Sequence, residues 1–148
     1  MKAGTIIVIT LSLWFLVLPT VYTFATESAT HVDIVQARFQ QLLDQWGYRE
    51  WWSMWEQGTR QSRSVISKDE FTQKMAGSRW QLACCDKRLR HVEIRPVSSG
   101  HVVVSATLLF ETKSLPGSAT EQSYRINLHF YLEEEQWRVD LSGLRHPT

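Results

Sequence analysis

Apolar residues recur along this chain with a helical period first and with a period of two after Gly77. Over residues 31–46 they are spaced three or four positions apart, which predicts an amphipathic helix with one apolar stripe. The stripe consists of Val32, Val35, Phe39, Leu42, Leu43 and Trp46. Thr30 is the candidate N-cap, and we expect Gly47 to end the helix.

A second, shorter helix is expected over residues 48–57, closed by Gly58. It would carry four aromatic side chains on one face: Tyr48, Trp51, Trp52 and Trp55. The polar residues 58–63 that follow are expected to form a loop.

A third helix is predicted to start at Ser67 with a capping box. In this motif the serine hydroxyl accepts a hydrogen bond from the backbone N–H of Glu70, and the glutamate carboxylate accepts one from the N–H of Ser67. Phe71 and Met75 are then expected to face inward, and Gly77 to end the helix.

After Gly77 the alternation predicts strands at 80–86, 88–97, 102–113, 121–132 and 137–144. The last three present one apolar and one polar face, as in an antiparallel sheet covered on one side. The sequence Ser98-Ser99-Gly100 suits a three-residue turn that pairs Val97 with His101. We therefore predict an α+β fold, in which three N-terminal helices pack on a curved four- to five-stranded antiparallel meander.

The N-terminus has the features of an export signal. Residues 3–18 carry no charge, Pro19 follows, and the small residues Thr23 and Ala25 suit cleavage after Ala25. The alternative is an uncleaved membrane anchor over residues 3–25, which is long enough to cross a bilayer. Either way residues 26–148 would form one domain outside the cytoplasm, periplasmic or secreted, or anchored and facing outward. The net charge of +1 argues against a nucleic-acid partner.

The order of these elements resembles the nuclear-transport-factor-2-like superfamily over residues 30–144. The resemblance rests on a Trp-rich short helix, the helix start Ile66–Phe71, and an ending that reads Tyr131-Leu132-Glu133 and Trp137-Arg138-Val139. It implies a cone-shaped fold with a pocket between the helices and the concave sheet face. The superfamily includes isomerases and cyclases as well as binding domains, so the fold alone does not give the function.

Six aromatic residues are the candidate lining of that pocket: Tyr48, Trp52, Trp55, Trp80, Phe110 and Tyr124. Such a lining would suit a small apolar ligand, although an aromatic stripe is more often core. The resemblance implies that an enzyme of this family would place an aspartate inside the cone. The inward positions of the last three strands carry no carboxylate, which weakens an enzymatic reading.

On the polar sheet face, pairing the hairpins predicts one row of Glu93, Ser105, His129 and Asp140. The row depends on pairing Val97 with His101, Phe110 with Tyr124, and Leu132 with Trp137. Ser105, His129 and Asp140 in line resemble a hydrolase triad. Solvated polar pairs are the better interpretation, because Ser105 lies mid-strand and not on a strained elbow. His91 is expected two strands from His129, so we expect no metal site, and no cofactor is implied.

Cys84 and Cys85 are adjacent, and neighbouring residues of a strand point to opposite faces. The preferred interpretation is one buried thiol and one exposed thiol that can bridge to a second chain. The alternative is a vicinal disulfide between the two.

Together these patterns favour an exported, non-catalytic domain that binds a small apolar ligand or another protein. By analogy with the superfamily, a homodimer through the polar sheet face is expected. The rival functions are a small cone-fold isomerase, cyclase or hydrolase, and a membrane-anchored periplasmic subunit of an envelope or secretion assembly. In the anchored case, membrane contact would be made through residues 3–25.

Overall fold

The computed structural model describes the backbone of residues 20–112 and 120–145, and side chains from His31 onward within these ranges. The helices are α1 (Thr20–Tyr48), α2 (Trp51–Glu56), α3 (Arg60–Val65) and α4 (Lys68–Ala76). The strands are β1 (Trp80–Leu82), β2 (Leu89–Ser98), β3 (His101–Thr112), β4 (Glu121–Glu133) and β5 (Gln136–Val139). Two 3₁₀ helices, η1 (Cys85–Arg88) and η2 (Leu141–Gly143), follow β1 and β5. The expected signal or anchor lies mostly outside the described residues.

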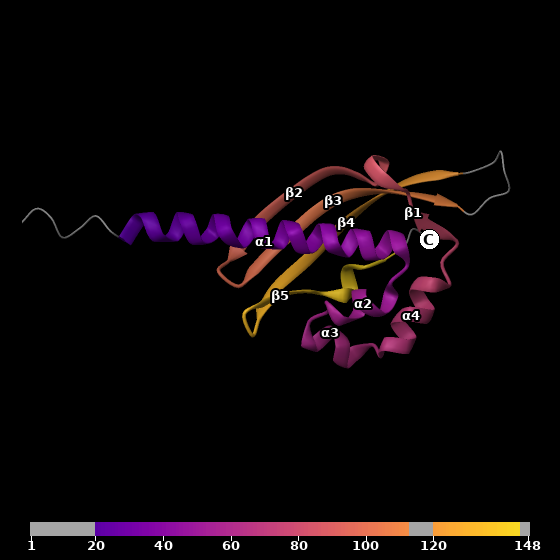
Figure 1. Cartoon of the computed structure of the whole chain (residues 1–148), viewed down its shortest axis with the longest axis horizontal. Coiled ribbons are helices and arrows are strands. Elements are labelled where there is room, and N and C mark those ends of the chain that lie inside the picture. The colour runs from indigo at the N-terminus through magenta and orange to yellow at the C-terminus, as the bar shows by residue number, and fades with distance from the viewer. Residues whose placement is uncertain (1–19, 113–119, 146–148) are drawn as a thin grey trace, which may run out of the picture.

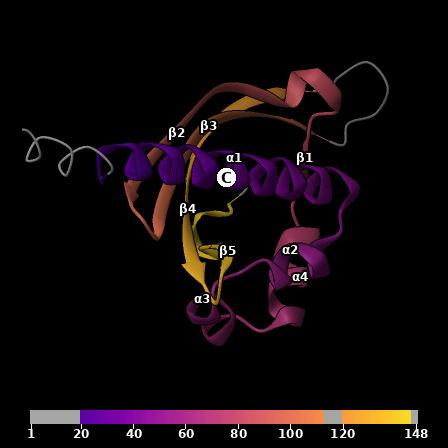
Figure 2. The same ribbon diagram turned by 60° about the vertical axis from the view of Figure 1, so that its left-hand side comes forward.

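The strands form a curved antiparallel sheet, and helices pack against it, which confirms the predicted α+β class. Strands β2, β3, β4 and β5 are joined as consecutive antiparallel hairpins. β1 pairs with the far end of β3, so β1 and β2 share one edge of that strand. α1 crosses the concave face of the sheet, and α2, α3 and α4 lie together near the C-terminal end of α1 (Figures 1 and 2).

Three predictions about the helices are corrected. α1 begins at Thr20, not at residue 31, and its first turns extend beyond the sheet (Figure 1). Among the described residues, no helix is both long and apolar enough to span a membrane. The anchor expected over residues 3–25 lies mostly outside them and stays a prediction. Residues 58–63 are not a loop: Thr59 accepts a hydrogen bond from the N–H of Ser62 and caps α3. The described part therefore has four α-helices, not three.

The capping box of α4 is confirmed: Ser67 and Glu70 exchange both hydrogen bonds, and Gly77 ends the helix. Phe71 and Met75 are buried, as expected from their spacing. This helix was predictable because its signals lie within one turn of sequence.

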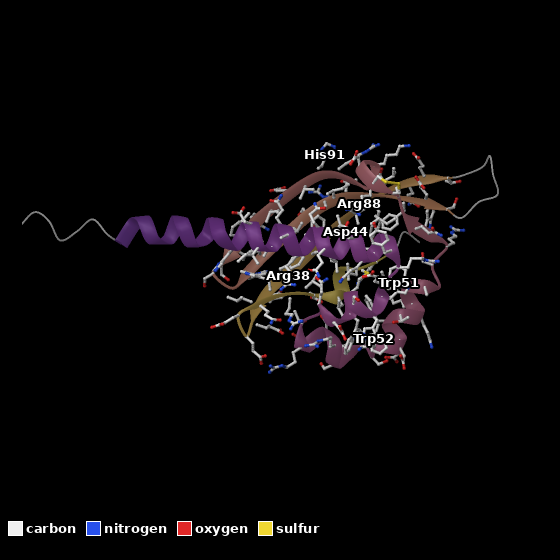
Figure 3. All side chains as sticks on the ribbon, in the orientation of Figure 1. Arg38, Asp44, Trp51, Trp52, Arg88 and His91 are labelled. Carbon is white, nitrogen blue, oxygen red and sulfur yellow. A yellow bond between two sulfur atoms is a disulfide. The ribbon has the colours of Figure 1, made fainter. Side chains whose placement is uncertain are left out.

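The aromatic face predicted for the second helix is wrong. Arg49 adopts a positive φ of 63°, which separates α2 from α1 and leaves Tyr48 79% exposed. Trp51 and Met54, three positions apart, form the buried side of α2, whereas Trp52 is 58% exposed (Figure 3). The indole N–H of Trp52 donates to Glu56 at 2.9 Å, one turn later on the outer side.

The outer strands are shorter than predicted. β1 ends at Leu82, before the cysteines. β5 ends at Val139 because the Asp140 side chain accepts from the N–H of Ser142 and starts η2. The β2–β3 turn is also tighter than expected, since Ser98, not Val97, pairs with His101.

Adjacent tryptophans provide a test of this packing. We expect Trp51→Ala to lower the free energy of unfolding by about 3 to 5 kcal/mol, since it empties a buried site. The control Trp52→Ala should cost at most about 1 kcal/mol, the scale of its exposed cation–π contact with Lys68. Urea unfolding followed by circular dichroism measures both values, and equal losses would contradict this orientation of α2.

Candidate functional site

The space between α1 and the concave sheet face is filled with side chains. Phe39, Leu42 and Leu43 of α1 have no exposed surface, and the ring of Trp46 contacts that of Phe110 edge to face at 5.6 Å. A void lined in part by Trp46, Trp51 and Trp80 has a volume of only about 10 Å³. Such a void holds at most one water molecule. The interior is therefore core.

The six candidate pocket residues are dispersed. Phe110 and Trp80 are buried in the core, and Tyr124 is half-buried with its ring 6.5 Å from that of Phe110. Trp55 is half-buried and donates its indole N–H to the carbonyl of Ile66 at 2.9 Å. Tyr48 and Trp52 lie at the surface. Phe110 and Tyr124 are thus brought together, but the six residues do not surround one cavity.

The predicted polar row is only half correct. Glu93 lies opposite Ser105, and Leu132 pairs with Trp137, both as predicted. Phe110, however, pairs with Gln122 and not with Tyr124, so the β3–β4 register differs by two residues. A shift of two leaves every side chain on its face, so the apolar pattern cannot detect it.

This register separates the hydrolase-like residues. Ser105 lies opposite Asn127, and its hydroxyl donates to the amide oxygen at 2.7 Å. His129 lies opposite Val103. Asp140 does lie beside His129, as expected, and its N–H donates to the histidine carbonyl at 2.8 Å. A Ser105–His129–Asp140 triad is therefore not formed.

The observed register instead brings three rings together on the outer sheet face, a cluster that the alternating pattern did not predict. His101 pairs with Tyr131, and their rings stack with centroids 4.5 Å apart. The Nε2 atom of His101 lies 3.0 Å from Nδ1 of His129, so one ring donates and the other accepts. Burial, and then the charges of His129 and Arg95, lower the pKa of His101. Its neutral form is thereby favoured.

A groove of about 560 Å³ adjoins these rings. It runs between α3, the start of α4 and η2, and Tyr131 lines it as well. Its apolar lining consists of Val65, Ile66, Phe71, Leu141 and Leu144, of which Val65 is 81% exposed. Lys74, Glu133 and Arg145 add charge to the lining. We call the three rings, Asp140 and this groove the outer-face site.

Asp140 joins the parts of the outer-face site. Its carboxylate accepts from the Ser62 hydroxyl at 3.0 Å and from the Ser142 N–H at 2.9 Å. Ser62 in turn accepts from the Thr59 hydroxyl and the Leu141 N–H. Burial would raise the pKa of Asp140, but hydrogen bonds from Ser142 and Ser62 and the His129 charge together lower it.

Asp140 suits hydrogen bonding better than proton transfer. A carboxylate with a lowered pKa stays ionised near neutral pH and is a poor general acid or base there. The Ser62 hydroxyl donates to that carboxylate, so it is held as a structural link between α3 and η2. Among residues 31–112 and 120–145, no group of three or more His, Cys, Asp or Glu side chains could hold a metal ion.

No known protein family model matches the chain, and no curated protein sequence is similar to it. Its function must be inferred from the geometry of the site.

The lowered pKa of Asp140 predicts a pH-dependent contribution to stability. At neutral pH we expect Asp140→Asn to cost about 1 to 3 kcal/mol, the scale of hydrogen bonds to a charged group. This difference from the wild type is present above the ordinary aspartate pKa of 3.8 and should be lost as the pH falls below it. Urea unfolding from neutral to acidic pH measures it. The control Asp33→Asn removes an exposed carboxylate and should cost little stability at neutral pH. A loss for Asp140→Asn that does not change with pH would contradict the assignment.

Proposed function

We propose that this chain is an exported, non-catalytic protein-binding domain of the nuclear-transport-factor-2-like type, and that it binds through its outer-face site. One observation carries the proposal: the side chains of α1 fill the concave interior in which such a fold would hold a small ligand. A binding function must then use the outside of the domain.

The composition of the core supports this choice over the enzymatic rivals. Apart from Thr59 and Ser62, the buried side chains of the described residues are all apolar. An isomerase or cyclase would need a carboxylate inside the cone, where burial could raise its pKa towards neutrality. His101, His129 and Asp140 of the outer-face site lie outside the cone, and the pKa of Asp140 is lowered and not raised.

The outer-face site has properties of a protein contact. Stacked aromatic rings are rigid and lose little conformational entropy on binding, and tyrosine is enriched among the residues that dominate binding energy. Tyr131 is 36% exposed, so a partner can reach it. The groove beside it offers apolar surface that a partner side chain could cover.

The partner that the charges fit best is a second copy of this chain. Charges of both signs are interspersed on the outer face of the sheet, at Arg90, Glu93, Arg95, Glu111, Glu121 and Arg125. Such a neutral, mixed surface can face itself across a two-fold axis, with opposite charges in contact. It has no single sign that would select a polyanion.

The proposal predicts that Tyr131→Ala weakens self-association about 30-fold, the effect of losing a contact worth ~2 kcal/mol. Sedimentation equilibrium of the purified protein measures the dimer dissociation constant. The matched control is Tyr48→Ala, which removes an exposed tyrosine outside the site. A wild type that stays monomeric would reject the second copy as partner. Equal effects of the two variants would reject the outer-face site.

One observation favours the anchored form as a second candidate. The backbone of α1 is helical without a break from Thr20 to Tyr48, so cleavage after Ala25 would fall within a helix and require it to unwind. This continuous helix extends past the sheet beside the β2–β3 and β4–β5 turns (Figure 1). As an uncleaved stalk, it would hold the domain close to a membrane.

Cell fractionation with sequencing of the mature N-terminus separates the two forms. For the exported soluble form we expect the mature chain to begin at Thr26, and Ala25→Trp to retain the protein in the membrane, because the position before the cleaved bond requires a small residue. A membrane-bound protein that begins at Met1, unaffected by Ala25→Trp, would establish the anchored form instead.

A further inference from the structure

β1 and β2 both pair with β3, and the segment that connects them leaves the sheet beside a single residue of β3. Leu82 pairs with Phe110 and Leu89 pairs with Leu108, so residues 83–88 lie opposite Leu109 alone. The N–H of Ala83 donates to the Leu109 carbonyl at 2.9 Å and closes the base of this excursion. Residues 84–88 do not pair with β3 and form a separate segment that contains η1.

The two cysteines lie in this segment and are bonded to each other. This corrects the preferred expectation of one buried and one exposed thiol, because Cys84 and Cys85 are both exposed. A disulfide between adjacent cysteines closes a small ring that includes the backbone. It can form here because the chain leaves the strand before Cys84, so the two side chains need not point to opposite faces of the sheet. Cys85 adopts φ of 61°, a left-handed conformation that residues other than glycine rarely adopt.

The same segment holds α1. The guanidinium of Arg88, in the last position of η1, lies 2.6 Å from the carboxylate of Asp44 on α1 (both are labelled in Figure 3). The side chain of Arg88 is 21% exposed and that of Asp44 is 52% exposed, so water reaches this ion pair from the side of α1. The conformation of the cysteine pair is thus linked, three residues later, to a contact with the central helix.

We propose that Cys84–Cys85 is a redox-active site that exchanges two electrons with a protein dithiol. A surface disulfide is open to in-line attack by an incoming thiolate, unlike a bond inside a core. Asp86, Lys87 and Arg88 follow in the same 3₁₀ helix. Arg88 is paired with Asp44, so Lys87 is the cationic neighbour that favours a thiolate as the leaving group.

The exchange takes place in two balanced steps. A thiolate of the partner dithiol attacks one cysteine sulfur; the Cys84–Cys85 bond breaks, and the other sulfur leaves as a thiolate that takes up a proton. The second thiol of the partner loses its proton and attacks the mixed disulfide, which releases the first cysteine as a thiolate that takes up a proton in turn. The domain ends with two thiols and the partner with one disulfide. The reverse sequence restores the pair.

Opening the ring removes the covalent constraint on Cys85, which can then return to an ordinary φ. We expect η1 to rearrange and the contact between Arg88 and Asp44 to loosen. The redox state of an exposed pair would in this way control how firmly the β1–β2 connection holds α1.

The test treats the full-length, folded protein with reduced thioredoxin as the dithiol, then traps thiols with iodoacetamide and measures intact mass. Before treatment we expect no alkylation and a monomeric mass on a non-reducing gel. After treatment two alkyl groups should be added without unfolding, and hydrogen exchange should rise in peptides covering 83–95. The control Cys84→Ser/Cys85→Ser should show the faster exchange without treatment and no response to the dithiol.

Three outcomes overturn the redox site, and a fourth overturns only its link to α1. Two thiols alkylated before treatment would show that the pair is not bonded. A covalent dimer on the non-reducing gel would show a bridge between chains. Alkylation that needs denaturant would show a structural disulfide that the dithiol cannot reach. A change in mass without a change in exchange would remove the link to α1 and leave only the redox site.

The variant Asp44→Asn isolates that link. It should leave the reaction with thioredoxin unchanged and raise hydrogen exchange at η1 already in the oxidised protein. None of these readouts depends on self-association, so they remain interpretable if the outer-face site fails its own test.

Discussion

The packing of α1 against the concave sheet face is the contact on which the rest of this structure depends. A curved sheet with one apolar face must cover that face, and a long helix with a single apolar stripe can do so along its length. Once Phe39, Leu43 and Trp46 occupy the hollow, no room remains there for a ligand. The same packing that stabilises the domain therefore also limits where it can bind.

The reactive groups are consequently found where regular elements end. Asp140 caps η2 and accepts a hydrogen bond from the Ser62 hydroxyl of α3. The cysteine pair lies between β1 and β2. The rings of His101 and Tyr131 lie near hairpin turns on the face that α1 leaves uncovered. These positions retain access to solvent but remain fixed to the core through hydrogen bonds or an ion pair. This combination suits recognition and thiol exchange better than catalysis in a dry pocket.

Local chemistry accounts for what could be predicted. The capping box of α4 acts within one turn, and the alternation along β3 and β4 identifies the buried face whatever the register. The predicted pairing of Leu132 with Trp137 was correct because the short turn between β4 and β5 fixes the register of that hairpin. The prediction of one aromatic face on the second helix was wrong for two reasons. The positive φ of Arg49 separates Tyr48 from α2, and Trp51 and Trp52, as neighbours in a helix, point about 100° apart, so that only Trp51 is buried.

The sequence by itself determined the α+β class, the apolar stripe of α1 and the inward side chains of the sheet, since each follows from the spacing of neighbouring residues. Only the tertiary structure decided the β3–β4 register, the ring cluster around His101 and the joining of Cys84 to Cys85. Sliding β4 by two residues preserves the buried face, so the pattern is blind to it. The cysteines could meet only because the chain leaves the sheet opposite Leu109, which depends on where two separate segments pair with β3.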